Sequence, residues 1–133
     1  LDSNLYEKLP QWIEQIVQNI ASNYGAQANI KFKSIAPPVY NDPELTSLLS
    51  TCAKNFMDEE NIVYLENPSL GAEDFAFFLQ DVPGTMFRLG VAGNQGCAPL
   101  HSGNFSLDER SLELGIKILS QTLVMASKTL QDI

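Results

Sequence analysis

The sequence predicts a mixed α/β chain in which short strands alternate with amphipathic helices. Apolar residues recur with a helical period in three segments, which begin near residues 5, 42 and 106. Short apolar runs bounded by turn residues separate these segments and are typical of strands. The resulting order is helix, strand, break, helix, strand, helix, strand, helix. Such alternation is typical of α/β or α+β architecture.

The first expected helix spans residues 5–24 and carries a broad apolar stripe. Pro10 either opens this helix at its first turn or kinks a longer one, and Gly25 is its expected end. Residues 29–35 alternate apolar and polar side chains, which predicts a half-buried strand. This strand has no local partner, and Pro37-Pro38 ends any regular ladder after it. The helix–strand pair is therefore incomplete on its own.

The second helix is predicted from the residues of its first turn. Asp42 suits the N-cap, Pro43 the first helical position, and Glu44 the positive end of the helix dipole. Cys52 lies in the apolar stripe of this helix and is expected in the core. Residues 62–65 then predict a short apolar strand.

The remaining elements follow from turn residues and acidic helix starts. Residues 73–79 predict a short helix, and residues 85–89 predict another strand. Residues 90–105 hold four glycines and are expected to form a loop. A capping box of Ser106 and Glu109 is expected to open the final helix.

The composition excludes several classes of partner. Sixteen acidic against eight basic residues give a net charge of -8 over 133 residues. Nucleic acids and anionic membranes need a basic patch, so neither is expected as a partner. The longest apolar stretches are far too short to predict a transmembrane helix. Cys52 and Cys97 are too few for a disulfide framework, so a reduced, cytoplasmic protein is expected, or an organellar one in a eukaryote. The chain starts at Leu1 rather than Met, which favours a piece of a longer protein.

His101 is the only histidine, and it lies in a Gly/Pro-rich segment of the kind that carries sites in α/β proteins. An imidazole can bind a metal or move a proton, but composition alone favours an ordinary surface or hydrogen-bonded histidine. One histidine cannot complete a zinc-type site, which needs three or four ligands. Cys97 lies nearby in sequence, so a Cys–His nucleophile pair is also considered.

Two further groups of charged residues each have a structural and a functional interpretation. Glu73 and Asp74 are either acids of a site or residues that complement a helix dipole. Asp108 and Arg110 flank the last helix start and are expected to be caps rather than catalysts.

Several motifs then occur in a fixed order: Gly71 to Ala76, Pro83-Gly84, Phe87 to Gly90, Leu100-His101-Ser102, Phe105 and Asp108-Glu109. In this order and spacing they resemble the C-terminal third of a metal-dependent amidohydrolase family. It is the metallopeptidase family of aminoacylases, hippurate hydrolases, N-acyl-amino-acid amidohydrolases and plant auxin-conjugate hydrolases. Residues 37–42 resemble that family's return from its small domain, so the resemblance covers nearly the whole chain.

The resemblance implies a division into parts of two domains. Residues 1–41 would be the last helix and strand of a ferredoxin-like small domain, which often mediates dimerisation. Residues 42–133 would be the C-terminal part of a phosphorylase/hydrolase-like catalytic α/β domain. A homodimer through the small domain is then possible, and the partners of the first strand would lie upstream.

The resemblance also implies a chemistry. His101 occupies the position of a metal ligand, Glu73 matches an acid near the active site, and Gly71 would line the substrate end of the cleft. The other ligands and the general-base glutamate have no counterpart in this sequence. The parent would use two divalent ions, Mn, Zn or similar, to activate a water that cleaves the amide bond of an N-acyl amino acid or peptide-like substrate. The chain alone is expected to be inactive and to bind no metal stably.

Three functions are therefore weighed. The first is a fragment of such an amidohydrolase, with no catalytic residue of its own besides one metal ligand. The alternative is a free-standing, non-catalytic α/β association domain. A distant third is a small hydrolase that uses Cys97 and His101.

Overall fold

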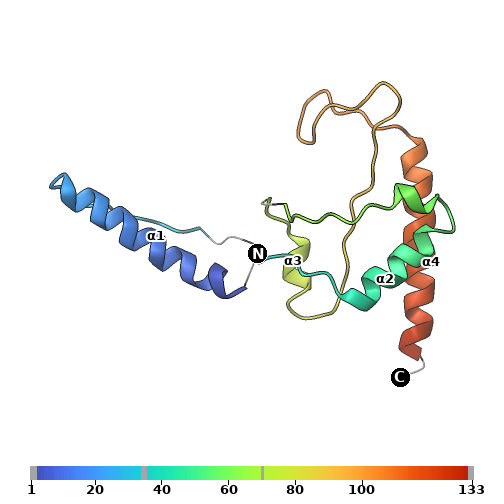
Figure 1. The fold of residues 1–133 in the computed structure, drawn as a ribbon, viewed down its shortest axis with the longest axis horizontal. Helices are drawn as coiled ribbons and strands as arrows, with labels where there is room; N and C mark the ends of the chain where they lie inside the picture. The colour runs from blue at the N-terminus through green and yellow to red at the C-terminus, as the bar shows by residue number, and fades with distance from the viewer. Residues whose placement is uncertain (1–2, 34–35, 70, 132–133) are drawn as a thin grey trace. The chain divides into compact units, whose positions relative to one another are not determined.

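The computed structural model describes residues 3–33, 36–69 and 71–131, and the chain forms two compact units (Figure 1). The first unit consists of residues 1–40 and 65–82, and the second unit consists of residues 41–64 and 83–133. The described helices are α1 (Ser3–Asn23), α2 (Pro43–Ala53), the 3₁₀ helix η1 (Glu59–Asn61), α3 (Phe75–Phe78) and α4 (Arg110–Gln131). The prediction of two domains divided at residues 41 and 42 stays a prediction.

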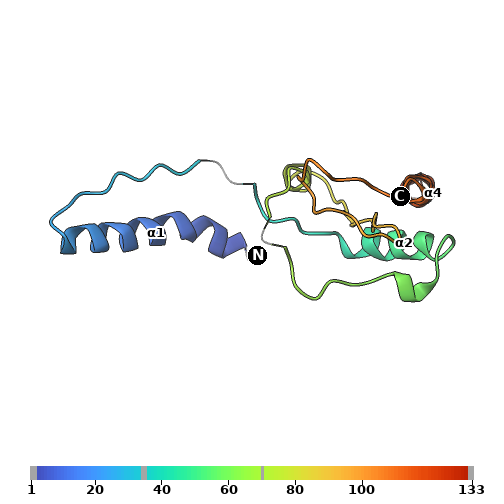
Figure 2. The ribbon, with the colours of Figure 1, turned by 90° about the horizontal axis from the view of Figure 1, so that it is seen from above.

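The first unit contains α1, the amphipathic helix that the sequence predicts. Pro10 lies inside this helix rather than in its first turn, so one backbone hydrogen bond is missing there. Gly25 follows the helix with φ of 67°, the left-handed conformation that commonly ends helices. The chain then turns back along α1, where the Gln18 side-chain amide donates to the Ala28 carbonyl (Figures 1 and 2).

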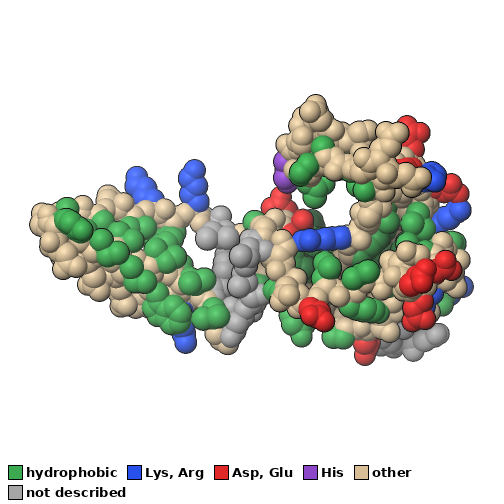
Figure 3. Space-filling view, turned by 45° about the horizontal axis from the view of Figure 1, so that its top comes forward, with side chains coloured by type: hydrophobic (Ala, Val, Ile, Leu, Met, Phe, Trp, Pro, Cys, Tyr) green, Lys and Arg blue, Asp and Glu red, His purple; other side chains and the backbone are tan. Residues whose placement is uncertain are grey.

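The apolar face of α1 is exposed. Its large apolar side chains each expose 41–58% of their surface: Leu5, Leu9, Trp12, Ile13, Ile16 and Ile20. Figure 3 shows hydrophobic side chains gathered along this helix. An amphipathic helix normally buries such a stripe, so α1 presents an apolar surface that the described residues leave open.

The second unit is built on α2 and α4, which pack side by side (Figure 1). α2 begins as predicted, because the Asp42 carboxylate accepts a hydrogen bond from the Leu45 amide at 2.9 Å and Pro43 takes the first helical position. Leu49 and Ala53 of α2 bury themselves against Ile118 of α4. These three residues form the core of the unit.

Two small residues complete the packing of these helices. Cys52 is 1% exposed, which confirms that it is a core residue. Gly115 lets α4 approach residues 85–89, because a Cβ atom at Gly115 would lie 2.9 Å from Leu89 Cδ2. A glycine inside a helix costs helix stability, and here it provides the space for Leu89.

The predicted strands at 29–35, 62–65 and 85–89 are wrong for the described residues, which form no ladder in these segments; Ser34 and Ile35 lie outside the description. The only bridge among the described residues joins Gly93 to Gly96. A strand exists only when a neighbour supplies its hydrogen-bond partners, and alternation in sequence cannot supply one. The described residues therefore form helices connected by irregular segments, and the predicted strands are the part of the α/β prediction that they do not show.

One pair of irregular segments still makes strand-like contacts through a side chain. The Asn41 side chain donates to the Met86 carbonyl at 2.8 Å and accepts from the Met86 amide at 2.9 Å. The Asp42 amide also donates to the Gly84 carbonyl at 2.8 Å. These bonds fasten the segment before α2 to residues 84–86.

Candidate functional site

Two hydrogen bonds close the loop of the second unit that carries His101. The Asp108 amide donates to the Val91 carbonyl at 2.9 Å. Nearer the tip, the Cys97 thiol donates to the Ser106 carbonyl at 2.9 Å. The glycine-rich segment is therefore a loop, as predicted, but it is closed at two levels.

His101 lies at the tip of this loop with φ of 67°, the only described non-glycine residue with a positive φ. This conformation costs a side-chain-bearing residue about 1 kcal/mol or more, so the surrounding turns must hold it. The Ser102 amide donates to the Pro99 carbonyl at 3.1 Å, and the Phe105 amide donates to the Ser102 carbonyl at 3.0 Å. Strain of this kind gathers at functional sites, which favours a role for His101 beyond an ordinary surface residue.

The His101 side chain is exposed, and no described residue hydrogen-bonds to its imidazole. Figure 3 draws it as the single purple side chain, at the surface of the molecule. An exposed imidazole of this kind fits one position in the coordination of a divalent ion.

Asp108 fixes the base of the loop to the start of α4. Its carboxylate accepts hydrogen bonds from the Arg110 side chain and from the Arg110 amide at 3.0 Å. These bonds lower the pKa of the Asp108 carboxyl from 3.8 to about 2. A Cβ atom at Gly93 would lie 2.9 Å from Asp108 Oδ2, so the loop rests closely on this carboxylate.

These contacts confirm Asp108 as a cap and overturn the predicted capping box. α4 begins at Arg110 rather than beside Ser106. The Ser106 carbonyl serves as the acceptor for the Cys97 thiol, and the Asp108 carbonyl accepts from Ser111. The Ser106 carbonyl therefore closes the loop, and the Asp108 carboxylate rather than the Ser106 hydroxyl accepts from the Arg110 amide at the helix start.

Cys97 faces backbone carbonyls. Besides the bond to Ser106, its sulfur lies 3.3 Å from the Ala98 carbonyl oxygen. A nucleophilic thiol needs a base within hydrogen-bond reach, whereas the hydrogen bonds of this thiol go to the Ala98 and Ser106 carbonyls rather than to the His101 ring. No sequence signal predicts this contact, because its acceptor is a backbone carbonyl nine residues away.

The two candidate substrate residues lie in the other unit, ahead of α3. The Glu73 carboxylate accepts a hydrogen bond from the Phe75 amide at 3.3 Å, so it satisfies an amide at the helix start. The Gly71 amide donates to the Ser69 hydroxyl at 3.1 Å. Both residues are exposed. Their local contacts explain the turn, and their part in substrate binding stays a prediction.

No three His, Cys, Asp or Glu side chains come together as a possible metal site in the part of the chain that the structure describes. His101 thus offers one ligand by itself, whereas protein zinc sites use three or four. Among the same residues, no helix combines the length and apolar character needed to span a membrane.

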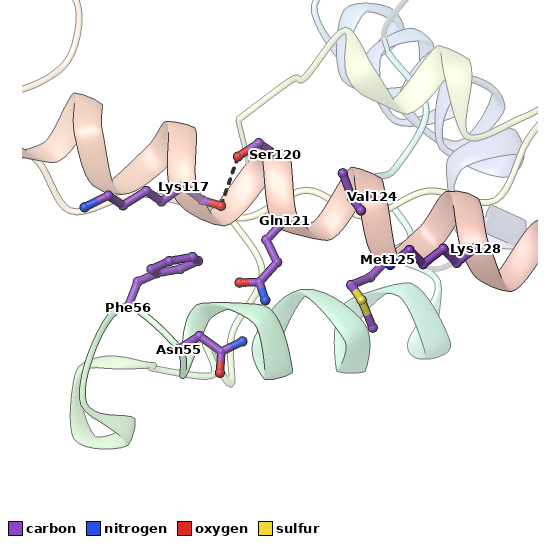
Figure 4. A pocket seen from close by; sticks show the side chains of 8 residues that line it. All are labelled: Asn55, Phe56, Lys117, Ser120, Gln121, Val124, Met125 and Lys128. Carbon is purple, nitrogen blue, oxygen red and sulfur yellow. Dashed lines mark hydrogen bonds between the residues drawn. The ribbon is translucent and has the colours of Figure 1, made fainter.

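A shallow groove, which the sequence analysis did not predict, lies between the end of α2 and the second half of α4 (Figure 4). Its large apolar lining residues are Phe56, Val124 and Met125, and Lys117 and Lys128 also line it. Gln121 points from α4 toward α2, and its carbonyl oxygen is buried without a hydrogen bond from the described residues (Figure 4). Only the packing of the two helices brings these residues together.

In a comparison with known protein families, residues 8–125 match peptidase family M20/M25/M40. A probable hydrolase of Synechocystis is 39% identical over 122 residues, which cover 90% of this chain and 31% of that protein. Thermostable carboxypeptidase 1 of Saccharolobus solfataricus is 38% identical over 118 residues, 86% of this chain and 29% of that protein. An N-acetyldiaminopimelate deacetylase of Pediococcus pentosaceus is 36% identical over 111 residues, 81% of this chain and 27% of that protein.

The chain thus spans less than a third of the length of these curated relatives. No solved structure matches it.

Proposed function

The chain belongs to peptidase family M20/M25/M40, and from this premise we propose that it is the C-terminal part of a metal-dependent amidohydrolase. The reaction we propose is hydrolysis of the linear amide bond of an N-acyl amino acid or a peptide-like molecule. The family match over residues 8–125 carries this proposal. Relatives named as a carboxypeptidase and a deacetylase support amide hydrolysis as the reaction class.

His101 is the residue that we assign to the metal. Its exposed ring and its left-handed backbone at the tip of a closed loop support this role. When bound, a divalent ion such as Mn²⁺ or Zn²⁺ supplies Lewis acidity and lowers the pKa of a bound water. His101 would supply one imidazole nitrogen to such an ion.

The other ligands and the proton-shuttling carboxylate come, in this proposal, from an upstream part of a longer protein. The relatives are about three times as long as their matched regions, which supports such a part. The isolated chain is then inactive and binds metal only weakly, because a single imidazole cannot complete a metal centre.

The remaining assignments extend the same proposal. Glu73 and Gly71 line the substrate end of the cleft in the longer protein. Residues 1–41 form the last helix and strand of a small domain that supports a homodimer. Residues 42–133 form the C-terminal part of the catalytic α/β domain. The exposed apolar face of α1 supports burial of that helix in a larger assembly. A cytoplasmic location belongs to this proposal too.

The test replaces His101 in the full-length protein that carries this chain. We expect His101→Ala to lower metal-dependent hydrolysis of N-acetyl amino acids by at least about 100-fold, since even residues that only support a ligand contribute 10–100-fold. Bound Mn and Zn, measured by elemental analysis, should fall with it. Near-normal metal content and rate would refute the assignment.

A matched variant separates chemistry from loop strain. Glycine adopts positive φ without penalty, so His101→Gly should keep or slightly raise thermal stability while losing activity to the same extent. If His101→Gly retained activity, the imidazole would have no role in the reaction.

The exposed face of α1 also favours the alternative of a non-catalytic association domain. The full-length protein decides between them. Metal-dependent amide hydrolysis that depends on His101 contradicts the alternative, and a metal-free, inactive protein that forms stable oligomers supports it.

A further inference from the structure

The segment that presents His101 is closed by one side chain. The Cys97 thiol reaches across nine residues to the Ser106 carbonyl, with the sulfur 2.9 Å from the oxygen. Cys97 is partly buried and free of any disulfide. No described residue between 97 and 106 is part of a helix or a strand.

The other hydrogen bonds inside this segment are local. The bonds from Ser102 to Pro99 and from Phe105 to Ser102 each span three residues, and the bond from the Asn104 amide to the Ser102 hydroxyl spans two. Local bonds shape the turns around His101, but they do not bring the ends of the segment together. Joining those ends costs chain entropy. The thiol–carbonyl bond offsets part of that cost, since a thiol is a weak donor.

A second closure lies outside the first. The Asp108 amide donates to the Val91 carbonyl, so the larger loop stays attached when the inner bond is removed. Loss of the Cys97 bond should therefore loosen residues 98–105 without unfolding α4.

We propose that Cys97 is a positioning residue, whose thiol–carbonyl bond to Ser106 holds the loop that presents the His101 imidazole. The step from loop order to metal binding rests on the proposed function, whereas the step from Cys97 to loop order does not. Cys97 touches neither substrate nor metal in this proposal, and it acts through His101 alone.

Replacement of Cys97 by serine distinguishes this proposal from a Cys–His hydrolase. A serine hydroxyl donates to a carbonyl as a thiol does, so Cys97→Ser should keep the loop closed. Serine is a poor substitute for a nucleophilic thiolate, so the same change would abolish a cysteine hydrolase. Alanine removes the donor in both cases.

The experiment compares Cys97→Ala, Cys97→Ser and Gln95→Ala in the full-length protein. Gln95 is exposed in the Gly93–Gly96 turn outside the closed segment and serves as the matched control. Hydrogen exchange followed by mass spectrometry reports the order of a peptide that covers residues 97–106. Titration of activity with Mn²⁺ reports the metal concentration for half-maximal rate.

We expect Cys97→Ala to speed exchange in that peptide and to raise the half-maximal Mn²⁺ concentration about 10- to 100-fold, as for residues that orient a ligand. The rate at saturating Mn²⁺ should recover. Cys97→Ser and Gln95→Ala should resemble the parent in both readouts.

Unchanged exchange in Cys97→Ala overturns the proposal, and so does a Cys97→Ser variant that behaves like Cys97→Ala. The two proposals fail separately. If His101→Ala leaves activity intact while Cys97→Ala loosens the loop, only the metal assignment falls. If His101→Ala abolishes activity while Cys97→Ala changes nothing, only the role of Cys97 falls.

Discussion

α1 and α4 are both long amphipathic helices, yet only α4 buries a large apolar side chain. α4 buries Ile118 against α2 but leaves Leu112, Ile116, Leu119 and Leu123 exposed, whereas none of the described side chains of α1 is buried. In both sequences, apolar residues recur with the period of a helix. The difference teaches that a hydrophobic stripe determines which face of a helix needs a partner, while the partner itself comes from elsewhere in the chain or outside it.

The largest expected effect comes from a matched pair of isoleucines. Ile118 in α4 is 2% exposed and Ile16 in α1 is 58% exposed. Ile118→Ala should lower the free energy of unfolding of the second unit by about 2–5 kcal/mol, because it removes buried methyl groups and leaves a cavity. Ile16→Ala should change the free energy of unfolding of the first unit, to which α1 belongs, by less than about 0.5 kcal/mol. Urea unfolding of the chain measures both values.

Equal effects of the two substitutions would break the comparison. A large loss from Ile16→Ala would mean that α1 buries its stripe in solution, for example against a second copy of the chain. Sedimentation of the parent at several concentrations would then identify that partner.

A second pair concerns the residues that disfavour each helix. Pro10→Ala restores a backbone hydrogen bond in α1 and should favour the helix there by up to about 3 kcal/mol, since no packing opposes it. Gly115→Ala in α4 gains up to about 1 kcal/mol of helix propensity, but its Cβ would lie 2.9 Å from Leu89 Cδ2, so the gain is cancelled. Far-UV circular dichroism and thermal unfolding report the two outcomes.

The control for this pair is Leu89→Ala. With that side chain shortened, Gly115→Ala should recover its gain in a double-mutant cycle. Additive effects of the two changes would show that Gly115 and Leu89 do not restrict each other.

The smallest expected effect is the pH dependence of the α4 start. Hydrogen bonds from the Arg110 side chain and amide lower the Asp108 pKa to about 2, below its ordinary 3.8. A carboxyl whose pKa is lower in the folded state stabilises that state above the ordinary pKa, and the stabilisation is lost as the pH falls from 3.8 through 2. The carboxyl carbon signal of Asp108, followed by NMR, should titrate near pH 2.

The Arg110→Ala variant isolates the cause of this shift. Without the guanidinium, the Asp108 pKa should rise toward its ordinary value, and the loop base should loosen at a higher pH. An unchanged titration would assign the shift to the backbone amide alone.

The candidate site was predictable in part. The single histidine and the surrounding glycines identified the loop, and the motif order identified the family that the comparisons show. The left-handed backbone of His101 and the Cys97–Ser106 bond were not predictable, since both depend on how distant backbone groups meet. The capping box failed because the Asp108 carboxylate, rather than the Ser106 hydroxyl, accepts from an amide at the start of the helix.

By itself, the sequence determined the local features of this protein. The cap at Asp42, the end of α1 at Gly25 and the buried position of Cys52 follow from short-range backbone geometry and from periodicity. Only the tertiary structure decided that the expected strands do not form among the described residues, which apolar residues are covered and how the His101 loop is closed. These features require a second segment to supply hydrogen-bond partners or apolar surface, and no local pattern specifies where that segment lies.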